Sequence, residues 1–415
     1  MVPDIKTRYR QTEAGLIPED WEVKELGLLA NIVTGKLDSN QAEDGGRYPF
    51  FTCAPEPLRI SSYSFDGEAM LLAGNNADGV FHTNYYKGKF DAYQRTYVIT
   101  AKNNSAFLRY LLYQLGFRLN YLKEISQGTA TRFLTKVILN GLKIPVPQMQ
   151  EQIRIATVLS DLDLKIELNQ DMNETLEAIA KAIFKCWFID FEFPNDEGKP
   201  YKSSGGLMVE SEIGRIPRNW KLETIGLVLS TRSGGTPSRD KPSYWENGTI
   251  GWINSGKVRD FRITEPVELI TQEALENSAT TLIPRDTTVI AITGATLGEV
   301  SFMEIESCIS QNVVAILGTN HIASEFIYFW IKHMMADLIS WQTGGAQQHI
   351  NKKIVDDSLL LEPDSETMGK FTAVIRPIFE RISASCFEAV SLTRLRDTLI
   401  PKLMSGQIRI PVEVR

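Results

Sequence analysis

The chain has 415 residues, and 44 Lys and Arg against 51 Asp and Glu give it a formal net charge of -7 at pH 7. A hydrophobic content of 43% with 23% charged residues is typical of a globular protein and excludes a collagen-like or disordered chain. The length predicts about two to three domains, each able to bury a core. The acidic balance by itself argues against a nucleic-acid partner.

Membrane, disulfide and zinc-site proteins are also disfavoured. No apolar run approaches the roughly 18 residues that span a bilayer, so no membrane partner is expected. The cysteines at 53, 186, 308 and 386 lie far apart without a Cys-x-x-Cys pair. This spacing favours reduced thiols in the cytoplasm over a disulfide framework or a zinc site.

An internal repeat organises the chain. Gly-Leu-Ile-Pro-Glu-Asp-Trp at 15–21 is echoed by Gly-Arg-Ile-Pro-Arg-Asn-Trp at 214–220, an offset of 199 (214 minus 15). Later identities, such as Lys136 with Lys352 and Pro147 with Pro363, keep an offset of 216 (352 minus 136), so the second copy has gained 17 residues (216 minus 199). Such self-similarity indicates a duplication and predicts two similar halves.

Each copy begins with a mixed segment and ends with a long helix. Short β-branched and aromatic runs alternate with turn signals and with amphipathic stretches, which predicts an α+β fold class. We expect two tandem α+β domains separated by two long helices that form an antiparallel coiled coil with pseudo-twofold symmetry. The expected ranges are 1–147 for the first domain, 148–190 for its helix, 191–213 for a linker, 214–363 for the second domain, 364–408 for the second helix and 409–415 for a tail.

The two helices carry a seven-residue apolar period, which is typical of a coiled-coil seam. Forty residues at about 1.5 Å per residue give about 60 Å, so each helix should leave its domain and pair with the other as a stalk. The alternative is two ordinary amphipathic core helices. Pro377 and Pro401 predict a kink or an early stop in the second helix. The expected seam residues are Ile155, Leu159, Leu162, Ile166, Asn169, Asn173, Leu176 and Ile183 in the first helix and Phe371, Ile375, Ile378, Ile382, Leu392 and Leu399 in the second.

Motifs for catalysis are weak. Gly251 to Lys257 has the spacing of a phosphate-binding loop, but Val258 stands where Ser or Thr would bind magnesium. Asp4 with Glu22 and Lys24 resembles a nuclease metal signature, yet Glu22 lies inside the repeated block. The sequence contains no His-Glu-x-x-His and no Asn-Pro-Pro-Tyr or Asp-Pro-Pro-Tyr loop for adenine methylation. We therefore expect no catalytic residue, no metal site and no cofactor in this chain.

Polar loops of the α+β segments offer amides, guanidinium groups, hydroxyls and Gly-rich backbones, which suit contacts to bases and phosphates. For any one of them, a purely structural role in a turn is an equal alternative. The DNA-binding candidates are Lys36, Gln94, Arg95, Thr96, Gln127, Thr129, Thr131 and Arg132 in the first copy, and Arg232, Ser233, Thr236, Ser238, Arg239, Lys257, Thr293, Thr296, Gln311, Asn312, Gln347, Gln348, His349 and Lys352 in the second.

Together these features resemble the specificity subunit of type I restriction-modification enzymes over nearly the whole chain. The motifs that carry the resemblance are 15–27 and 214–226, Ser-Gly-Gly-Thr-Pro-Ser at 233–238, Ile-Thr-Gly-Ala-Thr at 292–296, Lys-Phe-Asp-Ala-Tyr-Gln-Arg-Thr at 89–96, 143–156, 165–179 and Leu-Met-Ser-Gly at 403–406. The second helix lacks the Glu-Gln-x-Arg-Ile start found at 151–155.

The resemblance implies two target-recognition domains, each reading half of a bipartite asymmetric site in double-stranded DNA, with the helix pair as a ruler. It implies docking of two methyltransferase subunits, which use S-adenosylmethionine and flip an adenine, and of restriction subunits that need ATP and magnesium. Three alternatives remain open: a specificity subunit for a fused methylase-nuclease, a self-contained restriction enzyme, and a coiled-coil scaffold that binds no DNA. Because the first 150 residues and the last helix are mildly basic while the rest is acidic, the isolated chain should bind DNA weakly and salt-sensitively.

Overall fold

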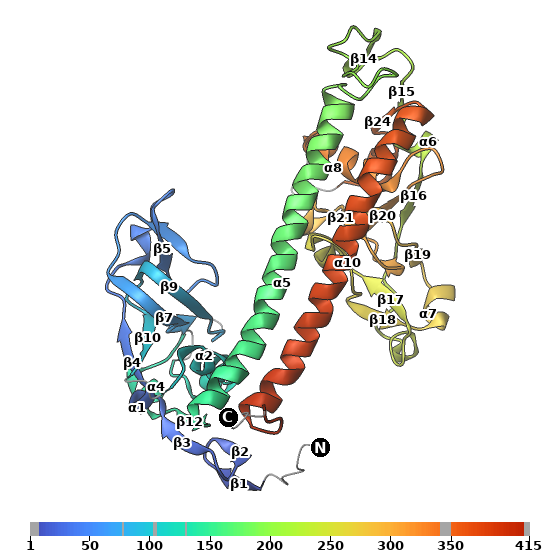
Figure 1. Ribbon diagram of the computed structural model, residues 1–415. Helices are drawn as coiled ribbons and strands as arrows, with labels where there is room; N and C mark the ends of the chain where they lie inside the picture. Colours follow the sequence, from blue (N-terminus) through green and yellow to red (C-terminus); the bar gives the residue numbers. More distant parts are fainter. Residues whose placement is uncertain (1–7, 77–78, 103–105, 129–130, 341–349, 411–415) are drawn as a thin grey trace, which may run out of the picture. The chain divides into compact units, whose positions relative to one another are not determined.

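The computed structural model describes residues 8–76, 79–102, 106–128, 131–340 and 350–410. The chain forms two compact units: unit 1 comprises Met1–Lys165 with Leu392–Arg415, and unit 2 comprises Ile166–Ser391. The long helices α5 (Met149–Phe184) and α10 (Ser365–Met404), green and red in Figure 1, each contribute residues to both units. The compact units thus differ from the two tandem repeats, because the start of each helix packs with the end of the other.

Unit 1 is built on a six-stranded sheet with the order β4-β10-β7-β9-β5-β6. Strand β9 pairs antiparallel with β7 and, through its last two residues, parallel with β5. Helix α2 packs on β7 and β9. Its elements are β1 (Tyr9–Thr12), β2 (Gly15–Pro18), β3 (Glu22–Glu25), α1 (Leu26–Leu29), β4 (Ala30–Thr34), β5 (Tyr48–Phe51), β6 (Leu58–Ile60), β7 (Phe65–Ala73), β8 (Asn75–Asn76), β9 (Thr83–Ala92), β10 (Thr96–Ala101), α2 (Leu108–Phe117), α3 (Leu119–Ile125), β11 (Arg132–Phe133), α4 (Lys136–Gly141) and β12 (Lys143–Val146).

Unit 2 follows the same path with two four-stranded sheets, β16-β23-β20-β21 and β18-β17-β22-β19. Two shorter strands, β21 and β22, occupy the position that the single strand β9 has in unit 1. The elements are β13 (Met208–Ser211), β14 (Gly214–Pro217), β15 (Lys221–Thr224), α6 (Ile225–Val228), β16 (Ser230–Ser233), β17 (Ile250–Ile253), β18 (Glu268–Ile270), α7 (Gln272–Glu276), β19 (Thr281–Ile283), β20 (Thr287–Ala291), β21 (Val300–Met303), β22 (Ser307–Ile309), β23 (Val313–Leu317), α8 (Ser324–Ser340), α9 (Lys352–Asp356) and β24 (Leu359–Glu362).

The structure confirms the duplication. The hairpin β1–β2 recurs as β13–β14 at an offset of 199 (208 minus 9), and β12 recurs as β24 at 216 (359 minus 143). Both hairpins turn at a glycine with positive φ, Gly15 at 104° and Gly214 at 98°, a conformation that L-residues with a side chain rarely adopt. A Cβ on Gly35 or Gly234 would collide with the carbonyl of Ala92 or Ile309, so both repeated glycines allow a loop to cross a strand closely.

The expected linker at 191–213 is instead an ordered part of unit 2. Phe193 is buried and stacks between Tyr201 and Trp220, with ring centroids 4.5 and 4.9 Å away. Strand β13 lies wholly within the range and pairs with β14. The expectation was wrong because turn residues such as those at 203–206 mark a change of direction and do not report whether the flanking aromatics are buried.

The two long helices that the heptads predict are present as α5 and α10. None of the fourteen expected seam residues is exposed in either helix, and Ile155, Leu159, Phe371, Ile375 and Ile382 are completely buried. Helix α5 ends in a π-helical turn at Lys185–Ile189, close to the expected boundary at 190. Helix α10 runs through Pro377 and Pro401, so the early stop does not occur, and both prolines lie on exposed faces. The carbonyl that Pro377 leaves unpaired belongs to the exposed residue Ala373, where water can replace the lost hydrogen bond.

Contacts within each unit show that α5 and α10 are antiparallel. In unit 1, Arg396 Nη1 donates to Asp163 Oδ1 over 2.9 Å. In unit 2, Asn169 Nδ2 donates to Glu388 Oε2 over 3.0 Å. From the first pair to the second the residue number rises along α5, from 163 to 169, and falls along α10, from 396 to 388. The polar centre of the seam is completed by Asn173 Nδ2, which lies 3.3 Å from Cys386 Sγ.

Replacement of Asn173 by Leu is expected to stabilise unit 2. Asn173 is buried, and its Oδ1 has no hydrogen-bond partner within the described residues. Because a buried polar atom without a partner is destabilising, Asn173→Leu should raise the free energy of unfolding by about 1 kcal/mol, read as a higher melting temperature in calorimetry. Asn169→Leu is the matched control and should give no gain, since it removes the hydrogen bond to Glu388. A lower melting temperature for Asn173→Leu would contradict the prediction.

A buried polar cluster attaches the sheets of unit 2 to both long helices. Arg262, whose side chain is fully buried, donates to Glu177 of α5 over 2.6 Å and to the Tyr328 hydroxyl of α8 over 3.0 Å. Its Nε lies 3.6 Å from Glu304 Oε1, and neither of these two atoms has a hydrogen-bond partner in the described residues. We call Glu177, Arg262, Glu304, Tyr328 and Lys332 the joint.

The joint is expected to make stability depend on pH through Glu304. Burial raises the pKa of this carboxyl above its usual range despite the attraction of Arg262. The folded chain therefore binds the proton more tightly than the unfolded chain. Ionised Glu304 destabilises the fold, and this effect is greatest at pH values above its folded-state pKa. Glu304→Gln should raise the free energy of unfolding near pH 8 by about 1 kcal/mol, and the gain should disappear below about pH 4.5.

Denaturation of the wild-type chain and of Glu304→Gln across this range provides the measurement. The exposed Glu299, just before β21, supplies the control Glu299→Gln. If Glu304→Gln is instead less stable near pH 8, the attraction of Arg262 outweighs burial and the assigned direction is wrong.

Candidate nucleic-acid interface

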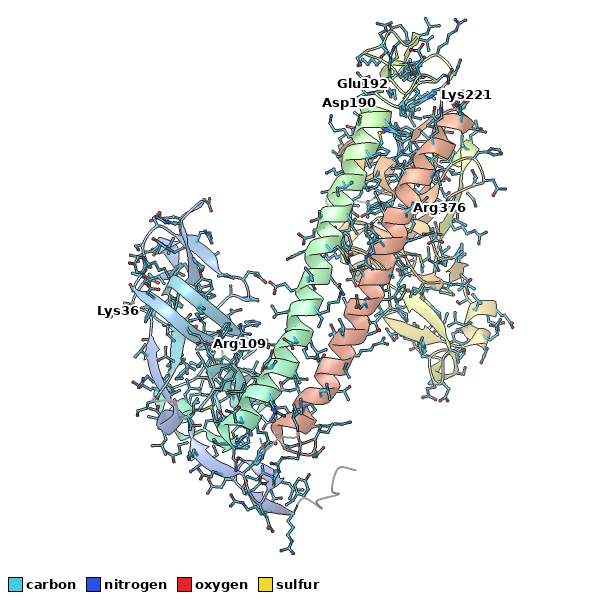
Figure 2. All side chains as sticks on the ribbon, viewed as in Figure 1. Lys36, Arg109, Asp190, Glu192, Lys221 and Arg376 are labelled. Carbon is cyan, nitrogen blue, oxygen red and sulfur yellow. The ribbon has the colours of Figure 1, made fainter. Side chains whose placement is uncertain are left out.

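The first cluster of candidate residues lies where β4 ends and β10 begins. The loop after β4 runs close to the start of β10, because Gln94 N donates to Leu37 O over 2.9 Å and Gly35 N donates to Thr96 O over 3.2 Å. This backbone pairing leaves Gln94 and Arg95 exposed, and Lys36 is exposed in the adjoining loop (Figure 2). The loops are therefore held by the main chain while their long polar side chains remain available.

A hollow of about 390 Å³ opens beside Arg95. It is lined by Thr34, Gly74, Asn75, Gln94, Arg95, Tyr97, Phe133 and Leu134. The Arg95 carbonyl accepts from Gly74 N over 2.8 Å, and Cys53 Sγ donates to Asn75 Oδ1 over 2.8 Å. An amide, a guanidinium group and a hydroxyl thus line one concave surface, a combination that can read base edges or bind phosphate.

The segment around 127–133 adds to the same surface. Gln127 and Phe133 exchange both backbone hydrogen bonds, at 3.0 and 2.8 Å, and Arg132 pairs with Asn76 between β11 and β8. Gln127 and Thr131 are exposed. The tertiary structure thus brings together most first-copy candidates, which lie up to about a hundred residues apart in sequence.

Unit 2 builds the equivalent surface with different side chains. The bonds Gly74 N to Arg95 O and Leu134 N to Gly74 O recur as Ile292 N to Asn312 O and Ile350 N to Ile292 O, both 3.0 Å. Asn312 therefore takes the place of Arg95, and Thr293 that of Asn75. Gln311 takes the place of Gln94, and its Oε1 accepts from Thr236 Oγ1 over 2.5 Å.

Several of the DNA-binding candidates are buried or make hydrogen bonds and ion pairs within the chain. Thr96 and Thr296 are 1% and 8% exposed because both pack under their loops. Arg239 makes two 2.7 Å hydrogen bonds with Glu268 and lies over the Trp245 ring, and the carboxylate raises the pKa of its guanidinium. Ion pairs also engage Lys257 with Asp260 and Lys352 with Asp356. Arg132 donates to the Lys123 carbonyl.

The remaining candidates divide into two groups. Arg232, Ser233 and Ser238 are exposed on or after β16. Thr129, Gln347, Gln348 and His349 lie outside the described residues. Sequence reasoning missed Thr34, Asn75 and Phe133; the Gly-Asn-Asn turn signal at 74–76 could have indicated Asn75, since its counterpart at 292–294 was identified.

Groups suited to catalysis or metal binding do not converge within the described part of the chain. No cluster of three or more His, Cys, Asp or Glu that could hold a metal ion occurs among the described residues. Burial raises the pKa of the Cys308 and Cys386 thiols to about 11, which keeps both protonated at neutral pH. No described helix is long and apolar enough to cross a bilayer.

Comparisons with known proteins agree on one family. The family model for the type I restriction modification DNA specificity domain matches twice, at residues 18–178 and 217–360. The MjaIX type I restriction enzyme specificity subunit of Methanocaldococcus jannaschii is 26% identical over 98% of this chain and 97% of its own. The EcoDI specificity subunit of Escherichia coli is 34% identical over 50% of this chain and 48% of its own.

A solved structure shows the same fold. The crystal structure of the type I restriction-modification S subunit from M. genitalium superposes with a TM-score of 0.65 at 17% identity, covering 92% of this chain and 96% of that one. The two family matches begin 199 residues apart (217 minus 18), which is the offset of the internal repeat. The chain therefore belongs to the family of type I restriction-modification DNA specificity subunits, in which it carries two copies of the specificity domain.

Proposed function

We propose that this chain selects the DNA target of a type I restriction-modification complex in the cytoplasm. The observation that carries the proposal is the recurrence of one loop cluster at equivalent places in both halves, with Gln94 and Arg95 exposed in one and Gln311 exposed in the other. The Gln94–Arg95 surface would read one half-site and the Gln311–Asn312 surface the other. Because Arg95 and Asn75 are replaced by Asn312 and Thr293, the two half-sites should differ in sequence, which makes the target asymmetric.

The helix pair would set the distance between the half-sites and would dock the partner subunits. In this proposal two methyltransferase subunits bind S-adenosylmethionine and methylate an adenine, and restriction subunits use ATP and magnesium. The chain itself contributes no catalytic residue and no cofactor. Its acidic balance supports the view that partner subunits neutralise most DNA phosphates, so the isolated chain should bind DNA weakly at physiological salt.

Methylome sequencing of cells that express this chain with its methyltransferase tests the proposal. The expected result is N6-methyladenine confined to one bipartite motif whose two specified parts flank unspecified bases. Methylation without sequence preference, or at a continuous motif, would refute it. Cleavage of DNA by the purified chain with magnesium alone would point instead to a self-contained restriction enzyme.

A further inference from the structure

The joint defined above connects α5, α8 and the segment after β21 through Arg262. Glu177 belongs to α5, while Tyr328 and Lys332 belong to α8 and Glu304 follows β21. Glu177 accepts from Arg262 over 2.6 Å, from Tyr328 over 2.7 Å and from Lys332 over 2.9 Å. Helix α10 contributes Phe379, whose ring lies against the Arg262 guanidinium.

Aromatic rings enclose the Arg262 guanidinium and remove it from water. Its Cζ lies 4.4 Å from the ring centroid of Phe261, 4.7 Å from Tyr328, 5.0 Å from Phe379 and 5.9 Å from Phe302. Burial of such an ion pair adds little stability compared with apolar packing of the same volume. Its directional hydrogen bonds do restrict how the surrounding elements can be oriented, so a role in orientation fits the cluster better than a role in stability.

The segment that carries Arg262 leads directly to the reading surface. Upstream, Ser310 N, next to Gln311, donates to Ile253 O over 3.0 Å. Arg259 Nη2 donates to Ala295 O over 2.6 Å, in the loop that follows Thr293. Any rotation of Arg262 about Glu177 would therefore move the loops that carry Gln311 and Thr293.

No equivalent of this joint occurs among the residues of unit 1 that the structure describes. At the offset of 216, the positions of Glu177, Tyr328 and Lys332 are taken by Thr393, Leu112 and Gly116. Unit 1 instead uses Asp163, which accepts from Tyr113 over 2.5 Å and from Arg396 over 2.9 Å. The joint is thus a device of the second half and is not part of the duplicated framework.

We propose that the Arg262–Glu177 joint is a positioning device, which holds the second reading surface in one orientation on the helix pair and thereby restricts the spacer length that the complex accepts. This inference rests on the proposed function. It assigns Glu177 and Arg262 as positioning residues that act through the loops at 293–296 and 310–312 and do not touch DNA.

The test uses the complete methyltransferase complex and duplexes that share both half-sites but have spacers of the native length or one base pair shorter or longer. The variants are Glu177→Gln, which removes the charge and leaves one accepting oxygen where the carboxylate has two, and Arg262→Lys, which keeps the charge but removes the fork of donors. Glu174→Gln, three residues before Glu177 and exposed, is the matched control. The exposed Arg376 of α10, which pairs with Glu325 (Figure 2), provides a second control as Arg376→Lys.

Either joint variant should reduce discrimination between the native and the altered spacers by about tenfold, while base preference within each half-site stays unchanged. A purely structural role would lower the rates on all spacers by one common factor, and that result would overturn the proposal. So would an altered base preference in the second half-site. If the wild-type complex methylates without sequence preference, the proposed function fails, whereas unchanged spacer discrimination in an otherwise specific complex refutes the joint alone.

Discussion

Paired removal of one heptad from each long helix is expected to abolish modification of the original target and to shift the accepted spacer by about three base pairs. Seven residues correspond to about 10.5 Å of helix, and successive base pairs are about 3.4 Å apart. The matched segments are 168–174 and 384–390, because Asn169 contacts Ser385 and Asn173 contacts Cys386. Seven residues are close to two full turns, so the seam faces of both helices are kept.

The measurement is methylation of a duplex series in which only the spacer length varies. The native spacer should lose at least about 100-fold in rate, since one half-site no longer meets its reader and each good base contact contributes about 1–3 kcal/mol. Three base pairs also rotate the DNA by roughly 100° about its axis, so the shorter spacer should be used at a reduced rate. Deletion from α5 alone mismatches the seam and should abolish assembly. Unchanged use of the native spacer after the paired deletion would exclude a ruler role.

Arg95→Ala is expected to impair one half-site only. Arg95 is exposed, its backbone carbonyl is held by Gly74, and its side chain lines the hollow next to Asn75 and Gln94. Loss of a bidentate guanidinium contact should weaken methylation of the target by about 10- to 100-fold and relax base selection at one position of that half-site.

The controls distinguish base reading from charge. Lys87 is exposed on β9, so Lys87→Ala removes one positive charge without touching the hollow and should leave base selection unchanged. Gln311→Ala in unit 2 should relax the other half-site, because Gln311 takes the place of Gln94. If Arg95→Ala weakens all sequences equally and base preference is kept, Arg95 contacts phosphate and does not read a base.

Local periodicity explains what was predictable from the sequence. The duplication, the α+β class and the two long helices were predicted correctly, since a heptad or a repeated motif is visible within one stretch of chain. The repeated glycines at 35 and 234 were also visible, although the carbonyls of Ala92 and Ile309 that require them were not. Position in a turn could not show that Thr96 is buried.

Tertiary structure decided the membership of the reading surfaces and the joint. Asn75 meets Arg95 only through strand pairing, and Arg239 forms its ion pair with Glu268, which lies 29 residues away in the sequence. Arg262 gives no signal in the sequence because it lies in a loop and its partners, Glu177 and Tyr328, come from two distant helices. The sequence alone therefore determined the duplicated framework and the helix period, whereas only packing between distant segments decided which polar side chains are free and which hold the fold.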